Sequence, residues 1–60
     1  MGADFYTLKE LADKLEVSTR TVQRMVDRGE LKEGADFYRL GRSLRFVKAS
    51  VIPKYHLREE

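Results

Sequence analysis

The first regular pattern in the chain places apolar residues on one face of a helix. These residues recur three and four positions apart, at Leu8, Leu11, Ala12 and Leu15. Thr7 and Glu10 have the spacing of a capping box, in which each side chain accepts a hydrogen bond from the other residue's backbone N–H. The pattern predicts a helix over residues 8–15.

A second amphipathic segment follows after a very short connection at residues 16–17. Ser18 is a favoured residue type immediately before a helix, and Gly29 is the type that commonly ends one. The apolar stripe between them consists of Val22, Met25 and Val26. The sequence therefore predicts a helix over residues 19–28, with Val17 in the turn pointing inward.

Beyond residue 36 the apolar spacing changes from helical to alternating, which is typical of strands. Residues 37–47 are predicted to form a β-hairpin, or wing, with a three-residue loop at residues 41–43. The register that matches the apolar faces pairs Leu40 with Leu44, Arg39 with Arg45, and Tyr38 with Phe46. Tyr38 and Phe46 are then expected to point inward. Gly41 stands earlier in this loop than three-residue loops usually require.

The last patterned stretch predicts a short helix over residues 51–57, with Ser50 as its cap. Pro53 then falls in the first turn, where its missing N–H removes no helical hydrogen bond. The elements in order are α-α-β-β-α, which is a mainly α fold with a small β-hairpin. We expect a winged helix-turn-helix, in a single domain over residues 1–60.

The outward face of the second predicted helix carries side chains suited to DNA. Short hydroxyl groups at the start of a helix donate to phosphates, while Arg and Gln read base edges in the major groove. The candidates of this kind are Ser18, Thr19, Arg20, Thr21, Gln23 and Arg24. The alternative is an ordinary helical hairpin, but its outer face usually carries mixed charges in i,i+4 pairs. We interpret residues 19–28 as a recognition helix.

The predicted wing is basic, and its candidate DNA contacts are Arg39, Arg42, Ser43 and Arg45. In the predicted register Arg39 and Arg45 are cross-strand neighbours, and like charges placed in this way destabilise a hairpin. Glu30, Glu33 or Asp36 would relieve that repulsion if the fold brings one of them near. Phosphates would also relieve it, and Arg42 at the tip would reach into a minor groove. The alternative is a hairpin edge that is kept basic to prevent aggregation.

The distribution of charge supports a polyanionic partner. The net charge of the whole chain is +2, but residues 37–58 contain arginines and lysines and no acidic residue. Such segregation creates one positive face, for which nucleic acid is the usual partner.

Other function classes find little support in the composition. The chain has no cysteine and a single histidine, His56, so neither a disulfide nor a zinc site is expected. It has no phosphate loop and no set of residues for nucleophilic catalysis, so we expect no cofactor, no metal and no enzymatic activity. No apolar run approaches the roughly 20 residues that span a bilayer, so we expect a cytoplasmic protein without a membrane partner.

Four segments of the chain resemble a known family. They are YTLKELADKL at 6–15, VSTRTV at 17–22, RGEL at 28–31 and LGRSLRF at 40–46. In this order they resemble the excisionase-type, MerR-like winged helix-turn-helix domains. The resemblance implies that Thr19, Arg20, Gln23 and Arg24 enter the major groove and that Arg42 enters the minor groove. The family usually has glycine where Glu16 stands, and a non-glycine residue there costs about 1 kcal/mol if its backbone is left-handed.

These observations predict sequence-specific binding to double-stranded DNA. The resemblance favours an excisionase, or recombination directionality factor, with an integrase or recombinase as partner. Because a single module covers only about 600–1,000 Å² of surface, we expect cooperative self-association on DNA, with bending. A small transcriptional regulator, or the DNA-binding head of a MerR-like regulator, is the alternative. From a different class, a protein-interaction module whose wing contacts an acidic partner also stays open.

Overall fold

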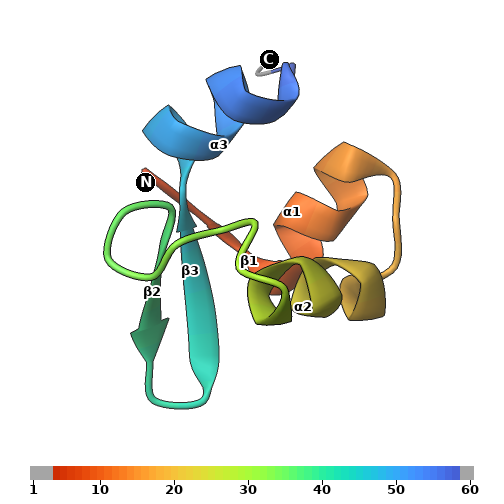
Figure 1. Ribbon diagram of the computed structural model, residues 1–60. Helices are drawn as coiled ribbons and strands as arrows, with labels where there is room; N and C mark the ends of the chain where they lie inside the picture. Colours follow the sequence, from red (N-terminus) through yellow and green to blue (C-terminus); the bar gives the residue numbers. More distant parts are fainter. Residues whose placement is uncertain (1–3, 59–60) are drawn as a thin grey trace.

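The structure, a computed structural model, describes residues 4–58 (Figure 1). Its elements are β1 (Phe5–Thr7), α1 (Leu8–Leu15), α2 (Thr19–Asp27), β2 (Phe37–Leu40), β3 (Ser43–Val47) and α3 (Lys48–Tyr55). This arrangement confirms the predicted fold class, a winged helix-turn-helix with mainly helical structure. The single domain over 1–60 stays a prediction, because residues 1–3 and 59–60 lie outside the described residues.

Strand β1 was not predicted from the sequence. It pairs antiparallel with β3, so the three-stranded sheet has the order β1-β3-β2. Phe5 lies opposite Val47, and Tyr6 lies opposite Phe46. The observed element order is therefore β-α-α-β-β-α. Three residues are too few to show an alternating pattern, so only the pairing with β3 reveals this strand.

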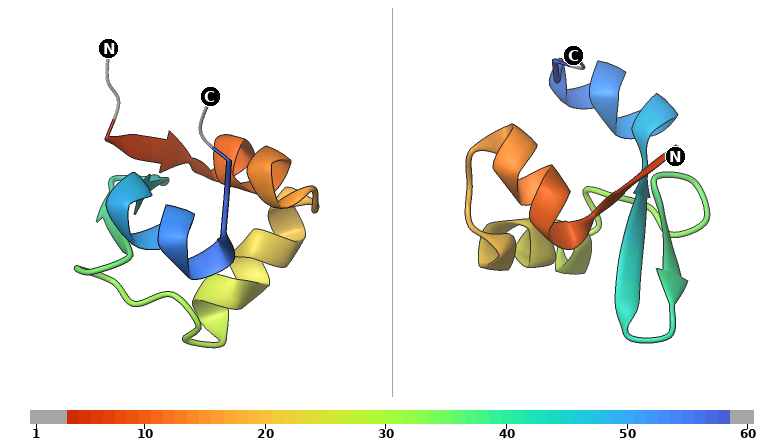
Figure 2. Two further views of the ribbon diagram at one scale, coloured as in Figure 1. Left: turned by 90° about the horizontal axis from the view of Figure 1, so that it is seen from above. Right: turned by 180° about the vertical axis from the view of Figure 1, so that it is seen from behind.

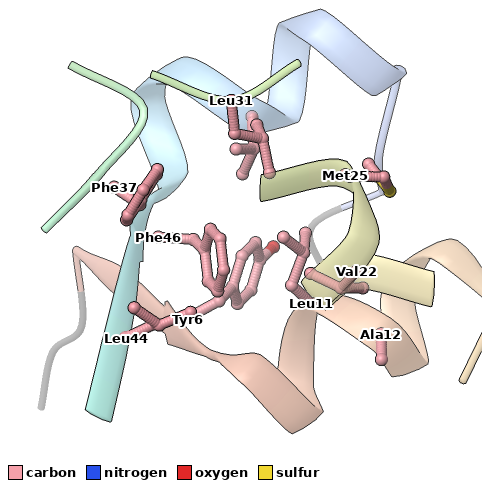
Figure 3. Close-up of a cluster of buried hydrophobic side chains, with 10 residues drawn as sticks. Tyr6, Leu11, Ala12, Val22, Met25, Leu31, Phe37, Leu44 and Phe46 are labelled. Carbon is pink, nitrogen blue, oxygen red and sulfur yellow. The ribbon is translucent and has the colours of Figure 1, made fainter. Parts of the chain in front are cut away.

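The apolar core lies between the sheet and the helices (Figure 3). Its buried members are Tyr6, Leu11, Ala12, Val22, Met25, Leu31, Phe37, Leu44, Phe46 and Val51. Phe46, on the central strand, is fully buried, and its ring lies 5.7 Å from that of Phe37 between centroids. Because the core draws on every helix and every strand, its packing sets the position of α2 relative to the sheet.

The predicted start of α1 is confirmed in detail. The Thr7 N–H donates to the Glu10 carboxylate at 2.9 Å, and the Glu10 N–H donates to the Thr7 hydroxyl at 3.1 Å, which completes the capping box. Helix α2 ends at Asp27, one residue earlier than predicted, with Arg28 as its C-cap. Gly29 has a positive φ of 83°, as expected for the residue that ends this helix.

The turn between α1 and α2 is tight. The Val17 N–H donates to the Ala12 carbonyl at 2.9 Å, and Ala12 is buried where the two helices meet. Glu16 has a φ of 61°, so this non-glycine residue does adopt the left-handed conformation. The prediction that Val17 points inward is wrong, because 38% of this residue is exposed.

The predicted register of the wing is also wrong. The hairpin has a two-residue loop, Gly41-Arg42, rather than a loop of three. The observed pairs are Phe37 with Phe46, Tyr38 with Arg45, Arg39 with Leu44, and Leu40 with Ser43. Gly41 has a φ of 60° and occupies the first turn position, where type II′ hairpin turns require glycine. The early position of this glycine is thus explained by the shorter loop.

The corrected register changes the surroundings of two predicted wing residues. Arg39 does not face Arg45, and its guanidinium instead lies 3.7 Å from the Glu33 carboxylate. The predicted repulsion between the two arginines is therefore absent. Tyr38 does not point inward, since 43% of it is exposed, whereas Phe46 is buried as expected.

Helix α3 begins three residues earlier than predicted, because β3 leads directly into it at Lys48. Its N-cap is Val47, which makes no side-chain capping bond. Ser50 lies within the first turn, and its hydroxyl donates to the Asp36 carboxylate instead of capping the helix. Pro53 consequently stands inside the helix rather than in its first turn.

Figure 2 shows how the elements surround the sheet. Helices α1 and α2 lie together on one side, and the hairpin turn extends away from α3. The start of β1 and the end of α3 both lie at the end of the molecule opposite to the hairpin turn. Within residues 4–58, no helix is long and apolar enough to cross a membrane.

Candidate nucleic-acid interface

Helix α2 is oriented by burial of its apolar stripe. Val22 is fully buried and Met25 is nearly so, and both face the core shared with Leu11. Successive helical residues turn by about 100°, so the residues between these positions must face solvent. The exposed residues of α2 include all the predicted contacts on this helix: Thr19, Arg20, Thr21, Gln23 and Arg24.

The start of α2 is fixed by a hydroxyl cap. The Thr21 N–H donates to the Ser18 hydroxyl at 3.3 Å, and the two hydroxyl oxygens lie 3.2 Å apart. Ser18 was predicted both as a cap and as a DNA contact, and the structure confirms the cap. Both residues remain exposed, so the capping bond does not remove them from the surface.

A groove of about 540 Å³ separates α2 from the wing. Its lining residues are Thr7, Leu8, Lys9, Thr19, Gln23, Arg39, Arg42, Ser43, Leu44 and Arg45. The groove thus joins two predicted contacts from α2, Thr19 and Gln23, with all four predicted contacts from the wing. In Figure 1 the hairpin turn extends beside and beyond α2, which places these two elements on the same side of the molecule.

The other predicted contacts do not line this groove. Arg20 and Arg24 each follow a groove residue by one position, so they lie about 100° further around α2, on the strip farthest from the core. Ser18 and Thr21 lie at the start of the helix. The structure therefore divides the predicted contacts into a group inside the groove and a group along its α2 rim.

Three further groove residues, which the sequence did not indicate, come from the end of β1 and the start of α1. The sequence pattern indicates only the capping box for Thr7 and the apolar helix face for Leu8, and it indicates no role for Lys9. Lys9 is exposed and adds a cation to the groove wall opposite the wing. Its basic side chain was the available indication, but only the packing of β1 beside β3 brings it close to the hairpin.

The arginines of the interface differ in their internal partners. Arg39 is 3.7 Å from the Glu33 carboxylate, and its guanidinium carbon lies 5.9 Å from the centre of the Phe37 ring. Arg45 is half-buried and donates to the Leu44 carbonyl at 3.3 Å. Arg20, Arg24 and Arg42 are exposed and have no ion pair or side-chain hydrogen bond with any residue of the described range 4–58. These three guanidinium groups are therefore available to an external anion.

The Glu33 carboxylate does not neutralise the wing. Both side chains of the Arg39–Glu33 pair are more than half exposed, and an exposed pair of this kind contributes at most about 1 kcal/mol. A polyanion can therefore replace Glu33 as the partner of Arg39 at little cost. The groove keeps a positive character.

Asp36, the buried carboxylate among residues 4–58, lies outside the groove and stabilises the fold. It accepts hydrogen bonds from the Ser50 hydroxyl, from the Lys32 N–H at 2.9 Å and from the Lys54 ammonium at 3.3 Å. The Ser50 and Lys32 hydrogen bonds, with a contribution from Lys54, hold the pKa of Asp36 below its usual value although burial opposes them. Asp36 therefore ties the connector before the wing to α3.

A second hollow, of about 690 Å³, lies between the ends of α1 and α3 and contains none of the predicted contacts. Tyr55 borders it, and the Tyr55 hydroxyl is buried without a hydrogen-bond partner among the described residues. Burial raises the pKa of this hydroxyl, so it stays neutral. Within residues 4–58 no cluster of His, Cys, Asp or Glu could hold a metal ion.

Comparison with known proteins agrees with this geometry. Residues 5–52, which include α1, α2 and the whole wing, match a family described as a helix-turn-helix domain. No curated protein and no solved structure shows a significant match. The family match covers most of the chain and contains both walls of the groove. The chain belongs to the helix-turn-helix domain family, a family of DNA-binding domains.

Proposed function

We propose that this protein binds double-stranded DNA in a sequence-specific manner, with α2 in the major groove and the wing in the adjacent minor groove. The observation that carries the proposal is the cationic groove whose two walls are α2 and the wing. The phosphate backbone between the two DNA grooves would enter this protein groove, with Gln23 on one side of it and Arg42 at the wing turn on the other. Arg24, on the rim of α2, completes the set that we assign to base recognition.

The two walls have different tasks in this proposal. Gln and Arg side chains on a helix discriminate base pairs through their donor and acceptor patterns in the major groove. The wing arginines contact phosphates and the narrower minor groove, which adds affinity with little sequence information. Replacing a residue of α2 should therefore change which sequence is preferred, whereas replacing a wing arginine should weaken binding to every sequence.

A random-site selection followed by titrations at several salt concentrations tests this division. Gln23→Ala and Arg24→Ala should each cost about 1–3 kcal/mol at the contacted base pair and relax the preference there. Arg42→Ala should weaken all sites alike and reduce the slope of log K against log salt by about 0.9 for each phosphate that the variant no longer neutralises. Arg58→Ala removes the same charge beside the second hollow and serves as the matched control. A selection that enriches no motif would show that the binding is not sequence-specific.

We further infer that several copies bind neighbouring sites cooperatively and bend the DNA, as an excisionase assisting a recombinase would. The small size of the module supports this inference, since one copy covers little of a duplex. Titration of duplexes with one site and with two adjacent sites, with bending followed by circular permutation, measures both properties. Equal affinity per site without bending would favour the alternative role of a simple transcriptional regulator.

A further inference from the structure

The sheet has a second face, which shares only Thr7, Ser43 and Arg45 with the duplex groove. Side chains alternate between the two faces of a strand, so the observed register assigns each residue to one side. The residues on the side away from the core are Phe5, Thr7, Tyr38, Leu40, Ser43, Arg45 and Val47. We call this set the outer sheet face. Helices α1 and α2 both lie on the opposite side of the sheet (Figure 2).

Two aromatic rings lie together on the outer sheet face and remain open to solvent. Phe5 on β1 and Tyr38 on β2 are 42% and 43% exposed. Their ring centroids lie 6.2 Å apart at an interplanar angle of 76°, an edge-to-face contact across the intervening strand β3. An edge-to-face pair leaves ring surface free for a further aromatic partner.

The charge on this face suits an anionic partner. Arg45 on the central strand lies opposite Thr7 on one side and Tyr38 on the other, so it stands between the strands that carry the two rings. None of the residues that form the outer sheet face is acidic. The positive charge of Arg45 is thus not balanced by a carboxylate of the same face.

The outer sheet face is continuous with the duplex groove. Thr7, Ser43 and Arg45 belong to this face by register, and the same three residues line the groove. A nucleic-acid strand that leaves the groove beside Arg45 would therefore reach the Tyr38 ring, which lies directly opposite Arg45, and then the Phe5 ring in contact with it.

We propose that the outer sheet face binds unpaired nucleotides, with bases stacked on Phe5 and Tyr38 and a phosphate held by Arg45. Aromatic side chains on a sheet, combined with a nearby cation, are the usual means of binding single strands. Neighbouring strands are about 4.8 Å apart, so a three-stranded sheet is wide enough for one or two bases. This site accepts single-stranded DNA independently of duplex recognition by α2.

A protein partner is the competing occupant of this face, because Leu40 is 57% exposed and adds aliphatic surface. The central arginine, the absence of acidic residues on the face and the continuity with the groove favour nucleic acid. A protein surface would require none of these features.

Fluorescence anisotropy with a labelled oligo-dT strand at low salt tests the proposal on the full chain. Tyr38→Ala and Phe5→Ala should each weaken binding about fivefold or more, the loss expected for one stacked base. Tyr38→Phe keeps the ring and should bind like the unmodified protein. Val17→Ala, which removes exposed apolar surface in the turn between α1 and α2, is the matched control and should leave oligo-dT binding unchanged. Thermal unfolding of each variant establishes that it is folded.

Three results would overturn the proposal: no binding of oligo-dT by the unmodified protein, unchanged binding by both alanine variants, or an altered oligomeric state of these variants in sedimentation. The last result would identify a protein-docking face instead. Gln23→Ala and Arg24→Ala separate this site from duplex recognition, because they should change duplex binding and leave oligo-dT binding within about twofold. The two proposals can therefore fail independently.

Discussion

The helix pair α1–α2 and the wing form the two walls of the same groove, but they are held in different ways. The helix pair buries Leu11, Ala12, Val22 and Met25, and a complete capping box fixes its first turn. The wing packs against the core through Phe37, Leu44 and Phe46, and all residues from Tyr38 to Ser43 are exposed. The difference indicates that the helix pair is the firmer of the two walls and the wing the more weakly anchored one. In the proposed binding mode the firmer wall would read the bases and the other would follow the DNA backbone.

The largest expected effect on stability comes from removing a buried side chain of the wing rather than an exposed one. Phe46→Ala should lower the free energy of unfolding by about 3–5 kcal/mol, because it leaves a cavity at the centre of the core. Leu40→Ala, on the exposed part of the same hairpin, should change that free energy by no more than about 0.5 kcal/mol. Urea titration followed by circular dichroism measures both. Similar losses of unfolding free energy in the two variants would contradict the distinction between buried and exposed residues of the wing.

Removing the hydrogen bonds by which Asp36 joins the connector to α3 should have the next largest effect on stability. Asp36→Asn removes the charged acceptor and should cost about 1–3 kcal/mol at neutral pH, as measured by urea titration. Glu33→Gln, which changes an exposed carboxylate in the same connector, is the control and should have little effect.

The same tie predicts a pH dependence. Because folding lowers the pKa of Asp36, its contribution is fully present above the unfolded value, near 3.8, and is lost as the pH falls through the folded value. The stability of the unmodified protein should therefore fall below about pH 4 more steeply than that of Asp36→Asn. Parallel curves for the two proteins would show that Asp36 does not contribute in this way.

On the helix side of the groove, Thr7→Ala tests the capping box. Loss of the hydroxyl that accepts the Glu10 N–H should cost about 1 kcal/mol. Lys9→Ala lies in the same turn and outside the box, so it should be nearly neutral for stability. Thermal melts of both variants give the comparison. Equal melting temperatures would show that the capping box does not stabilise α1.

The smallest expected change is a gain. Glu16→Gly should raise the free energy of unfolding by up to about 1 kcal/mol, because glycine adopts a φ of 61° without steric cost. Asp13→Gly, inside α1, places the same residue type where it should destabilise by about 0.3 kcal/mol, because Asp is itself a poor helix former. Opposite changes in melting temperature are expected, and a loss in both variants would mean that Glu16 is not strained.

The sequence predicted the helix pair well because its information is local. Thr7, Glu10, Ser18 and Gly29 act on neighbouring residues, and the structure confirms each as a cap or helix end. The predictions were wrong where contacts between segments distant in sequence determine the local structure. Ser50 looks like a cap, but the buried carboxylate of Asp36, 14 residues away, accepts its hydroxyl. Strand β1 exists only through pairing with β3, near the opposite end of the chain.

The candidate site also divides into a part that local sequence information predicts and a part that depends on long-range contacts. The residues of α2 follow from helical periodicity, but the wing register depended on the loop length, which the position of Gly41 indicates. The prediction of a three-residue loop placed Tyr38 in the core. The exposed aromatic pair that Tyr38 forms with Phe5 was therefore not expected. Lys9 joins the groove only because β1 brings the start of α1 beside the hairpin.

The positions of the first and last described segments have a practical consequence. Since β1 starts and α3 ends at the pole remote from the hairpin turn, a fluorophore, surface linker or fused domain attached beyond either segment would point away from a docked duplex (Figure 1). Attachment at either end should therefore give the same affinity for duplex DNA. In a larger assembly, this placement would leave a fused domain on the side that faces away from the DNA, where it could contact a second DNA site.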